Sequence, residues 1–453
     1  MGLLLNRTPV RLLESRSRAR PVQSDSALPT SVEVVVIGGG FVGTCVALTL
    51  AERGVPVALC EKGVIAGEAS GRSMGYVDSQ MLDPSKFELV SRSKALWSQL
   101  NTRTGIDTGY RPTGLLQVLS GPEDEQAAHA WLGSINGVPL IGGQVVTAKQ
   151  IVELVPGLQD PPAAALYTPT DASVEPQLAA PAIAEAAQRK GAHIIQGCAA
   201  RGLETTAGRI SAVVTEKGII ACKSVVLAGG AWSSLFLRSL GLSLPQLNVY
   251  MSMMGLSEVA GPKIPYSAGS YGFRPQTDGR YTLGGVHFAA PIEPATLANL
   301  SRLAPAIRAF WPMAKVGFSP SQFWHDLRQP SSWPLDRPSP FEARRIVEPQ
   351  FRPGPLEAGL EELRRYLPVF RDAKIVDRWS GIVTSTPDNM PVIGPVPGHP
   401  GLFVGTAFTF GLTMGPAAGE ALADLATGRT PVIKLQDYRF ERFNDGSPIT
   451  FRG

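Results

Sequence analysis

A glycine-rich turn between an apolar run and a helical stretch is the feature that most restricts the fold of this chain. Residues 32–37 form an apolar run rich in β-branched side chains, and a second apolar run covers residues 56–60. Between them, Gly38, Gly40 and Gly43 open a stretch rich in alanine and leucine. Glycines at these positions permit a tight turn, close approach of a pyrophosphate and close packing of the helix. The pattern predicts a strand, a helix and a strand that bind a dinucleotide.

The residue after the second apolar run supports this prediction. Glu61 has the spacing expected of a carboxylate that accepts hydrogen bonds from the ribose hydroxyls of adenosine. Backbone N–H groups at the helix start, including those of Phe41 and Val42, would receive the pyrophosphate together with the positive end of the helix dipole. The glycine pattern alone does not distinguish NAD from FAD.

The composition is that of a globular chain large enough for two domains. Of its 453 residues, 44% are hydrophobic and 18% are charged. The formal net charge of +4 is spread along the chain without basic stripes. Nucleic acid is therefore not expected as a partner.

The sequence lacks the motifs of metal sites and serine hydrolases. The four cysteines, Cys45, Cys60, Cys198 and Cys222, are far apart in apolar surroundings, which is typical of buried thiols in a reducing compartment. The histidines form no HExxH or His/Cys cluster, and no GxSxG motif is present. We expect no disulfide, no metal and a cytoplasmic location.

Two segments resemble targeting or membrane sequences. Residues 389–419 contain no charged side chain, but glycines and prolines interrupt them, so we expect buried strand, turn and helix start rather than a membrane span. Residues 1–30 are expected to form a disordered tail. Because residues 1–20 are rich in arginine and poor in acids, a mitochondrial presequence remains an open alternative.

The rest of the chain mixes helical and strand-like stretches without internal repeats. Residues 314–354 are proline-rich with little periodicity and are expected to form a long functional loop. Residues 210–215 and 218–221 predict a β-hairpin. Helices are expected over residues 87–102, 147–154, 176–190 and 357–366, and further strands over residues 114–120, 193–195 and 224–227.

Four segments, taken in order, resemble the D-amino-acid oxidase superfamily, which includes glycine oxidase, sarcosine oxidase and D-amino-acid dehydrogenase. They are GEASGRSMG at residues 67–75, DASVEP at 171–176, VVLAGGAWS at 225–233 and TPDNMPVIG at 386–394. The resemblance spans roughly residues 31–430 and makes FAD, rather than NAD, the expected cofactor.

The resemblance implies an α/β protein with a Rossmann-like FAD-binding domain and a second, mainly antiparallel-sheet (α+β) substrate domain. The implied FAD-binding domain is discontinuous, and a C-terminal tail follows it. The FAD-binding domain covers residues 31–110, 165–245 and 375–430, the substrate domain residues 111–164 and 246–374, and the tail residues 431–453.

The same resemblance implies where FAD is held. The Ser-Gly-Arg segment would line the diphosphate and flavin ring, the backbone near Ala200 would hold the adenine, and residues 229–232 would pass close to the flavin. The helix start at residues 410–415 could direct N–H groups at the pyrimidine edge and stabilise the anionic reduced flavin. The expected contacts are Gly38, Gly40, Phe41, Val42, Gly43, Glu61, Lys62, Ser70, Gly71, Arg72, Ser73, Ala200, Gly229, Gly230, Trp232, Gly411, Leu412, Thr413 and Met414.

Three positions depart from the relatives. Gly381 stands where sarcosine oxidases carry a flavin-linking cysteine, so the flavin should be noncovalent. Val383 stands where glycine oxidase and its D-amino-acid relatives place a carboxylate-binding arginine, and Thr413 where sarcosine oxidases place a lysine. Valine cannot replace a bidentate guanidinium, so a simple α-amino acid substrate becomes less certain.

Four other residues are candidate substrate contacts. Arg274 and Arg378 are possible replacements for the missing cation, and a structural or surface role is the alternative for each. Tyr250 and Tyr271 could supply aromatic walls or hydroxyl donors, with a core position as the alternative. Residues that catalyse the reaction are not identified.

The leading hypothesis is an FAD-dependent enzyme that oxidises the C–N bond of an amine or amino-acid-like substrate to an imine by hydride transfer. Dioxygen, a quinone or a protein carrier would reoxidise the flavin, and a homo- or hetero-oligomer is possible. One alternative is a flavin-dependent hydroxy-acid dehydrogenase, with His287 or His325 as the required base. Another is a flavin-binding subunit that acts with partner chains.

Overall fold

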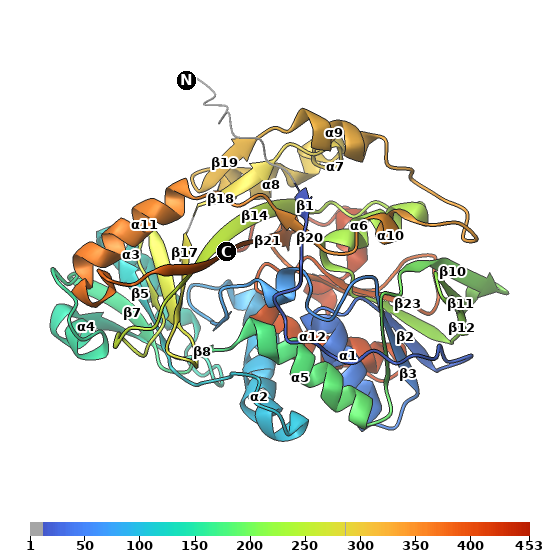
Figure 1. Cartoon of the computed structure of the whole chain (residues 1–453), viewed down its shortest axis with the longest axis horizontal. Helices are drawn as coiled ribbons and strands as arrows, with labels where there is room; N and C mark the ends of the chain where they lie inside the picture. Colours follow the sequence, from blue (N-terminus) through green and yellow to red (C-terminus); the bar gives the residue numbers. More distant parts are fainter. Residues whose placement is uncertain (1–11, 286) are drawn as a thin grey trace.

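A six-stranded sheet forms around the apolar run that precedes the glycine turn (Figure 1). The computed structural model describes residues 12–285 and 287–453. Five strands of this sheet are parallel, and β22 is antiparallel to its neighbour β23. In spatial order the strands are β22 (Val392–Pro395), β23 (Leu402–Thr406), β13 (Ser224–Leu227), β2 (Val34–Ile37), β3 (Val57–Glu61) and β9 (His193–Gln196).

Both faces of this sheet are covered, which is why its strands are apolar without alternation. On one face, α1 (Phe41–Glu52) contacts α5 (Pro176–Arg189) and α12 (Gly411–Ala426), and α12 contacts α2 (Phe87–Thr104). The helices α1 and α12 can approach closely because Gly419 has no side chain. A Cβ there would lie only 2.5 Å from that of Cys45. A three-stranded sheet of β10 (Ala200–Thr206), β11 (Arg209–Thr215) and β12 (Gly218–Ala221) packs on the other face.

A second, ten-stranded and mainly antiparallel sheet adjoins the first. The longest strands of this sheet, β14 (Leu247–Leu256) and β21 (Ile375–Ser385), pair along their whole length. The helix α11 (Gly354–Tyr366) packs against it. Its other strands are β5 (Leu115–Leu119), β6 (Gln144–Thr147), β7 (Ala164–Thr168), β15 (Tyr266–Ser267), β16 (Tyr271–Pro275), β17 (Tyr281–Gly285), β18 (Phe288–Pro291) and β19 (Ala314–Gly317).

The expected fold class is confirmed, since a parallel sheet with flanking helices adjoins an antiparallel sheet. The strands β7 and β21 belong to the large sheet, whereas the expected boundaries assigned β21, and β7 from residue 165 on, to the FAD-binding domain. The predicted helices correspond to α2, α4 (Ala148–Leu154), α5 and α11, and the predicted hairpin to β11 and β12. All four cysteines are free and buried, as expected.

The prediction of a long irregular loop over residues 314–354 is wrong. This stretch contains β19, α9 (Pro320–Leu327), α10 (Pro340–Ala343) and β20 (Val347–Pro349). Proline is tolerated in the first turn of a helix, where its missing N–H has no helical partner. Both helices begin in this way, and Ser319 and Ser339 cap their N-termini. Pro320 and Pro340 therefore mark helix starts, while the connection between the two helices, residues 328–339, is irregular.

Residues 12–30 do not form the expected disordered tail. The strand β1 (Leu12–Glu14) pairs with β20, the N–H of Arg20 donates to the carbonyl of Gln177, and Asp25 bonds the backbone of Ile194. The segment is ordered because edge strands and helix ends supply partners for its backbone. Residues 1–11, the rest of that prediction, lie outside the described residues.

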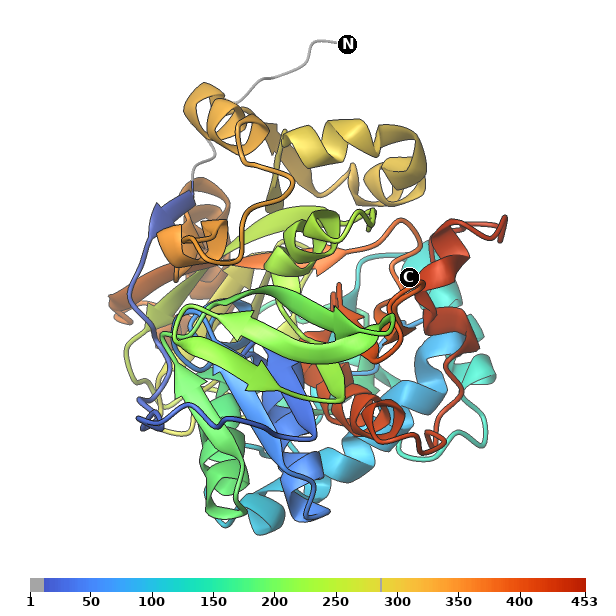
Figure 2. The ribbon, with the colours of Figure 1, turned by 90° about the vertical axis from the view of Figure 1, so that its right-hand side faces the viewer.

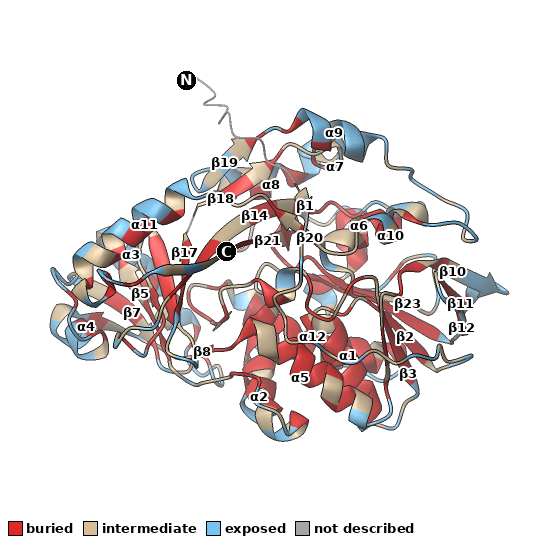
Figure 3. Ribbon diagram, in the orientation of Figure 1, coloured by how far each residue is buried: buried red, intermediate tan, exposed pale blue. Residues whose placement is uncertain are grey.

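Three helices form a cap on the large sheet, far from α2 and α5 (Figure 2). They are α7 (Pro294–Ala298), α8 (Leu300–Phe310) and α9, and the cap is one of the most exposed parts of the molecule (Figure 3). Within residues 12–285 and 287–453, no helix has both the length and the apolar composition needed to cross a membrane. Residues 389–419 form β22, β23 and the start of α12, as predicted.

Candidate functional site

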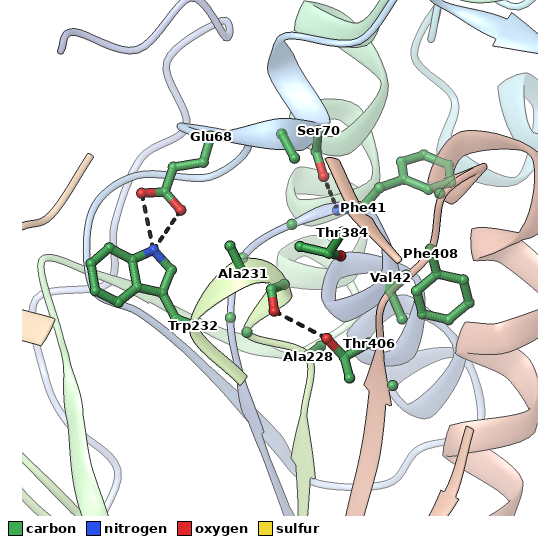
Figure 4. A pocket seen from close by; sticks show the side chains of 18 of the residues that line it. Phe41, Val42, Glu68, Ser70, Ala228, Ala231, Trp232, Thr384, Thr406 and Phe408 are labelled. Atoms are coloured by element: carbon green, nitrogen blue, oxygen red, sulfur yellow. Dashed lines mark hydrogen bonds between the residues drawn. The ribbon is translucent and has the colours of Figure 1, made fainter. Parts of the chain in front are cut away.

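A cavity lies at the carboxyl ends of β2, β3 and β13, where ligands of open α/β sheets bind. Gly38, Glu61 and Ala228 follow or end these strands and line it. Residues of β21 and the start of α12 complete the wall, so both sheets contribute (Figure 4). The cavity therefore extends from the glycine turn towards the large sheet.

The glycine turn leaves no room for side chains. Gly38 has a φ of 111°, and a Cβ there would lie 2.4 Å from the carbonyl oxygen of Ala228. A Cβ at Gly43 would lie 2.0 Å from the carbonyl oxygen of Gly38. Gly40 immediately precedes α1 and lines the cavity, so the positive end of this helix faces the space. This cradle suits a pyrophosphate.

Glu61 lies beside the turn with its carboxylate in the cavity wall. It accepts hydrogen bonds from the N–H groups of Gly39 and Gly63, each at 2.7 Å. Burial raises the pKa of Glu61, while nearby Lys62 and the two N–H groups oppose the rise. The two N–H donors fix the carboxylate at the position that adenosine ribose hydroxyls would approach.

Lys62, Glu68 and Trp232 line the cavity as a connected wall. Figure 4 shows the pairing of Glu68 with Trp232. The ammonium of Lys62 lies 3.0 Å from Glu68 and 4.4 Å from the centre of the Trp232 ring. The indole N–H of Trp232 donates to Glu68 at 2.9 Å. Glu68 also accepts from the N–H of Val347, which ties the wall to β20. Glu68 is a lining residue that our sequence analysis did not select.

Two serines of the 67–75 segment line the cavity. Ser70 Oγ accepts the N–H of Phe41 at 2.8 Å, as Figure 4 shows. Ser73 Oγ is buried and has no hydrogen-bond partner among the described residues. Because buried hydroxyls are rarely left unpaired, this group fits a polar ligand in the cavity. The glycine cradle and the free hydroxyl together fit FAD.

Arg72, by contrast, lies outside the cavity lining. Its guanidinium is buried, lies 2.6 Å from Glu348 and donates to the carbonyl oxygen of Gly67. Gly71 also lies behind the wall, where a Cβ would meet the carbonyl oxygen of Ala66 at 2.3 Å. These two residues shape the segment rather than face the space.

The far end of the cavity is built by β21, β23 and α12. Thr406 Oγ1 donates to the carbonyl oxygen of Gly230 at 3.0 Å and joins two parts of the wall (Figure 4). Gly411 and Leu412 line the cavity, whereas Thr413 and Met414 lie behind it. Lining residues missed by sequence analysis include Phe341, Ile382, Thr384, Phe408 and Thr409. No local motif marked them, because the pairing of distant segments brings them together.

The structure brings most of the expected FAD contacts together. Gly43, Gly71, Arg72, Thr413 and Met414 lie outside the lining. The expected contacts that line the cavity are Gly38, Gly40, Phe41, Val42, Glu61, Lys62, Ser70, Ser73, Ala200, Gly229, Gly230, Trp232, Gly411 and Leu412.

None of the four candidate substrate contacts lines the cavity. Arg274 is buried in a bidentate ion pair with Glu175, with N–O distances of 2.9 and 3.0 Å. Tyr271 is buried in an aromatic core, and Arg378 is exposed on β21. Tyr250 packs near Ile382 and Trp232, which line the cavity. Val383, the position expected to hold a carboxylate-binding arginine in relatives, does line it.

Known proteins resemble this chain over most of its length. The family model "FAD dependent oxidoreductase" matches residues 33–425. The glycine oxidase of Pseudomonas putida is 28% identical over 422 residues, which cover 90% of this chain and 98% of that protein.

Two solved structures resemble the whole molecule. The L-amino acid deaminase of Proteus myxofaciens, solved with anthranilate, is 36% identical with a TM-score of 0.94, covering 97% of this chain and 100% of that one. The L-amino acid deaminase of Proteus vulgaris is 34% identical with a TM-score of 0.88, covering 93% and 100%.

Proposed function

The chain belongs to the FAD dependent oxidoreductase family and is an FAD-dependent enzyme, and we propose that it oxidises the C–N bond of an L-α-amino acid to an imine. The observation that supports this proposal most is the similarity to L-amino acid deaminases, which extends over nearly the whole of both chains. The resulting imine hydrolyses in water to a keto acid and ammonia.

Bound FAD supplies a hydride acceptor for the Cα–H bond of the neutral amine, so the protein needs to orient the substrate and exclude water. The glycine turn and the start of α1 would hold the pyrophosphate, and Glu61 would hold the adenosine ribose. Ile382, Val383 and Phe408 supply apolar walls at the end of the cavity near α12. The start of α12 directs its positive end to the same region.

A hydroxy-acid dehydrogenase receives less support, because removal of a hydroxyl proton needs a base. Neither His287 nor His325 lies among the described residues that line the cavity. The second candidate, a flavoprotein that acts with a partner, is favoured by one observation. Large apolar side chains are exposed on the cap, including Trp311 and Trp324, and exposed apolar patches often mark interaction sites.

The test is anaerobic reduction of the holoenzyme, monitored as a loss of flavin absorbance. Release of flavin by heat without proteolysis would establish noncovalent binding. We expect L-amino acids to bleach the flavin and to yield a keto acid and ammonia in equal amounts. Glycine, D-amino acids, N-methyl amino acids and hydroxy acids serve as comparison substrates.

Each outcome decides between the candidates. Bleaching by hydroxy acids alone would replace the proposal with the dehydrogenase, and bleaching by D-amino acids alone would reverse the stereochemistry. Flavin that none of these compounds reduces would favour the partner-dependent flavoprotein. Admission of air then shows whether dioxygen reoxidises the flavin.

A further inference from the structure

A partly buried carboxylate lies against the first turn of α12, just behind the cavity wall. Asp78 follows β4 (Tyr76–Val77), and its Oδ1 accepts the hydroxyl of Thr413 at 2.9 Å. The N–H of Asp78 donates to the same hydroxyl oxygen at 3.1 Å. Gly411 and Leu412, one and two residues before Thr413, line the cavity. Asp78 is therefore joined to the helix end that borders the proposed flavin site.

The charged neighbours of Asp78 leave it without a cation of its own. The ammonium of Lys94 on α2 acts on Asp78 through its charge, but it donates to Asp171 at 2.7 Å, and also to Ser79 and Thr170. Asp171, which precedes β8 (Ala172–Ser173), adds a second negative charge. No described residue forms an ion pair with Asp78 at hydrogen-bond distance, in contrast to Asp171 and Glu175.

Two more groups face this region. Burial raises the pKa of Tyr76 on β4, and the negative charge of Asp78 adds to the rise. The guanidinium of Arg274 on β16, which is paired with Glu175, opposes it. The hydrogen bond from the Thr413 hydroxyl, in the first turn of α12, is the largest influence that favours the ionised form of Asp78, and the charge of Lys94 adds to it. Burial, followed by repulsion from Asp171, raises the pKa of Asp78 to about 6, and the Thr413 hydrogen bond opposes the rise.

We propose that Asp78 is a positioning residue that takes up a further proton when FAD is reduced, and so makes the reduction potential of the enzyme depend more steeply on pH than the flavin alone would. The inference rests on the proposed function in that α12 must border the flavin. Transfer of a hydride to FAD adds one negative charge at the end of α12, where Asp78 already lies. A new negative charge next to a carboxylate favours its protonated form.

The step balances in atoms and charge. A hydride passes from Cα of the neutral amine to FAD, so the substrate leaves as a protonated imine and the cofactor gains one negative charge. Asp78 then takes one proton from solvent. The carboxylate is already protonated well below pH 6 and stays ionised well above the higher pKa that the reduced flavin imposes, so proton uptake is confined to the range between these two values.

The test measures the reduction potential of the holoenzyme between about pH 5 and pH 8, with dithionite and reference dyes rather than substrate. Asp78→Asn keeps an oxygen that accepts from Thr413 but cannot ionise. We expect the variant to have the higher potential at pH 8, and the difference to vanish as pH falls to 5. Asp107→Asn, an exposed carboxylate paired with Arg111, is the matched control and should leave the potential unchanged.

A second variant separates charge from structure. Thr413→Val retains the carboxylate but removes its hydrogen bond, so the pH range of proton uptake should move upwards. A difference between wild type and Asp78→Asn that is the same at pH 5 and pH 8, or absent at both, would overturn the proposal. Because dithionite reduces the flavin whatever the substrate, these outcomes are independent of whether L-amino acids are oxidised.

Discussion

At the scale of single residues, the glycine turn gives a sharp prediction about FAD binding. Gly43→Ala would place a Cβ 2.0 Å from the carbonyl oxygen of Gly38 and force the turn apart. Such overpacking costs about 1–3 kcal/mol, so we expect the FAD dissociation constant to rise about tenfold to a hundredfold. Flavin titration of the apoprotein by fluorescence quenching measures it.

Gly121→Ala is the matched control. Gly121 has an extended backbone and open space around the position of a Cβ, so the variant should bind FAD like the wild type. An unchanged dissociation constant for Gly43→Ala would show that the turn relaxes without loss of the pyrophosphate site.

Glu293 gives a prediction about stability and pH. The hydroxyl of Tyr250 and the amide of Asn248 donate to its carboxylate, at 2.9 and 3.0 Å. Burial raises the pKa of Glu293 from 4.5 to about 7. Because the folded-state pKa exceeds the unfolded one, the folded state binds more protons between these values, and stability falls as pH rises through this range.

Glu293→Gln should therefore be the more stable protein at pH 8 and similar to the wild type at pH 5. A pKa shift of this size corresponds to a gain of at most about 3 kcal/mol in the free energy of unfolding of the variant at pH 8. About 1 kcal/mol of this gain is lost because the amide accepts one hydrogen bond fewer than the carboxylate. Urea unfolding at both pH values measures the difference. If the stability of the variant relative to wild type were lower at pH 8 than at pH 5, the assignment would be contradicted. Glu123→Gln on exposed α3 (Pro122–Ser134) is the control.

The residues that could be predicted from sequence are those whose constraint is local. Gly38, Gly40 and Glu61 lie within one strand, helix and strand unit, so spacing alone locates them at the cavity. Arg72 and Arg274 could not be placed in this way, because their partners Glu348 and Glu175 are distant in sequence. Arg72 neutralises the partly buried Glu348 and Arg274 the buried Glu175, roles that no local pattern reveals.

At the scale of elements, the segment around α10 closes one end of the cavity. Phe341 lines the cavity, and neighbouring Glu342 forms a two-pronged ion pair with Arg201, at 2.9 and 3.0 Å. The indole N–H of Trp333 donates to the carbonyl oxygen of Arg201 at 2.8 Å. Ala200, expected to hold the adenine, immediately precedes this arginine. The segment therefore covers the proposed adenosine end.

We expect Arg201→Met to release FAD several-fold faster than the wild type, because the ion pair with Glu342 is lost while the apolar stem is kept. A partly exposed ion pair contributes about 1 kcal/mol or less, so the effect should be modest and should shrink at high salt. Stopped-flow mixing with an excess of an FAD-specific apoprotein, which traps the released FAD, measures the rate. Arg111→Met, which breaks an exposed pair with Asp107 far from this segment, should not change it.

Element prediction succeeded where periodicity was strong and failed where prolines were common. The strand β13 has the predicted bounds, and α2 and α5 differ from prediction by at most two residues at an end. The segment that carries α9 and α10 was expected to be a loop, because prolines at helix starts and at irregular backbone look alike in a sequence. The pairing of β1 with β20 depends on residues more than three hundred positions apart, which no local pattern encodes.

At the scale of the whole molecule, the architecture could be predicted but the substrate side could not. The parallel sheet follows from its own apolar strands, whereas the wall near α12 needs β21 of the large sheet to meet β23. The missing carboxylate-binding arginine at Val383 was visible in the sequence. The residue that replaces this arginine depends on the pairing of distant strands. None of the four substrate contacts predicted from the sequence lines the cavity.

The cap of α7, α8 and α9 gives a prediction for the molecule as a whole. Leu300, Trp311, Trp324 and Leu327 are each more than half exposed, and Leu297 is 48% exposed. Patches of this kind on a folded protein mark contact surfaces. We expect the wild type to associate reversibly as its concentration rises, and Trp311→Ser combined with Trp324→Ser to weaken this association several-fold in sedimentation velocity.

The same substitutions should leave the melting temperature and flavin reduction unchanged, because exposed side chains contribute little to the core and neither tryptophan lines the cavity. Val376→Ser with Val432→Ser, which removes two exposed apolar side chains outside the cap, is the matched control and should not alter association. A wild type that remains monomeric at every concentration would leave the cap free to contact another molecule, whereas weaker association in the control alone would place the contact elsewhere on the surface. If the cap variant lost flavin reduction as well, the cap would be coupled to the site through β14 and β18, which pair at Tyr250 and Ala289.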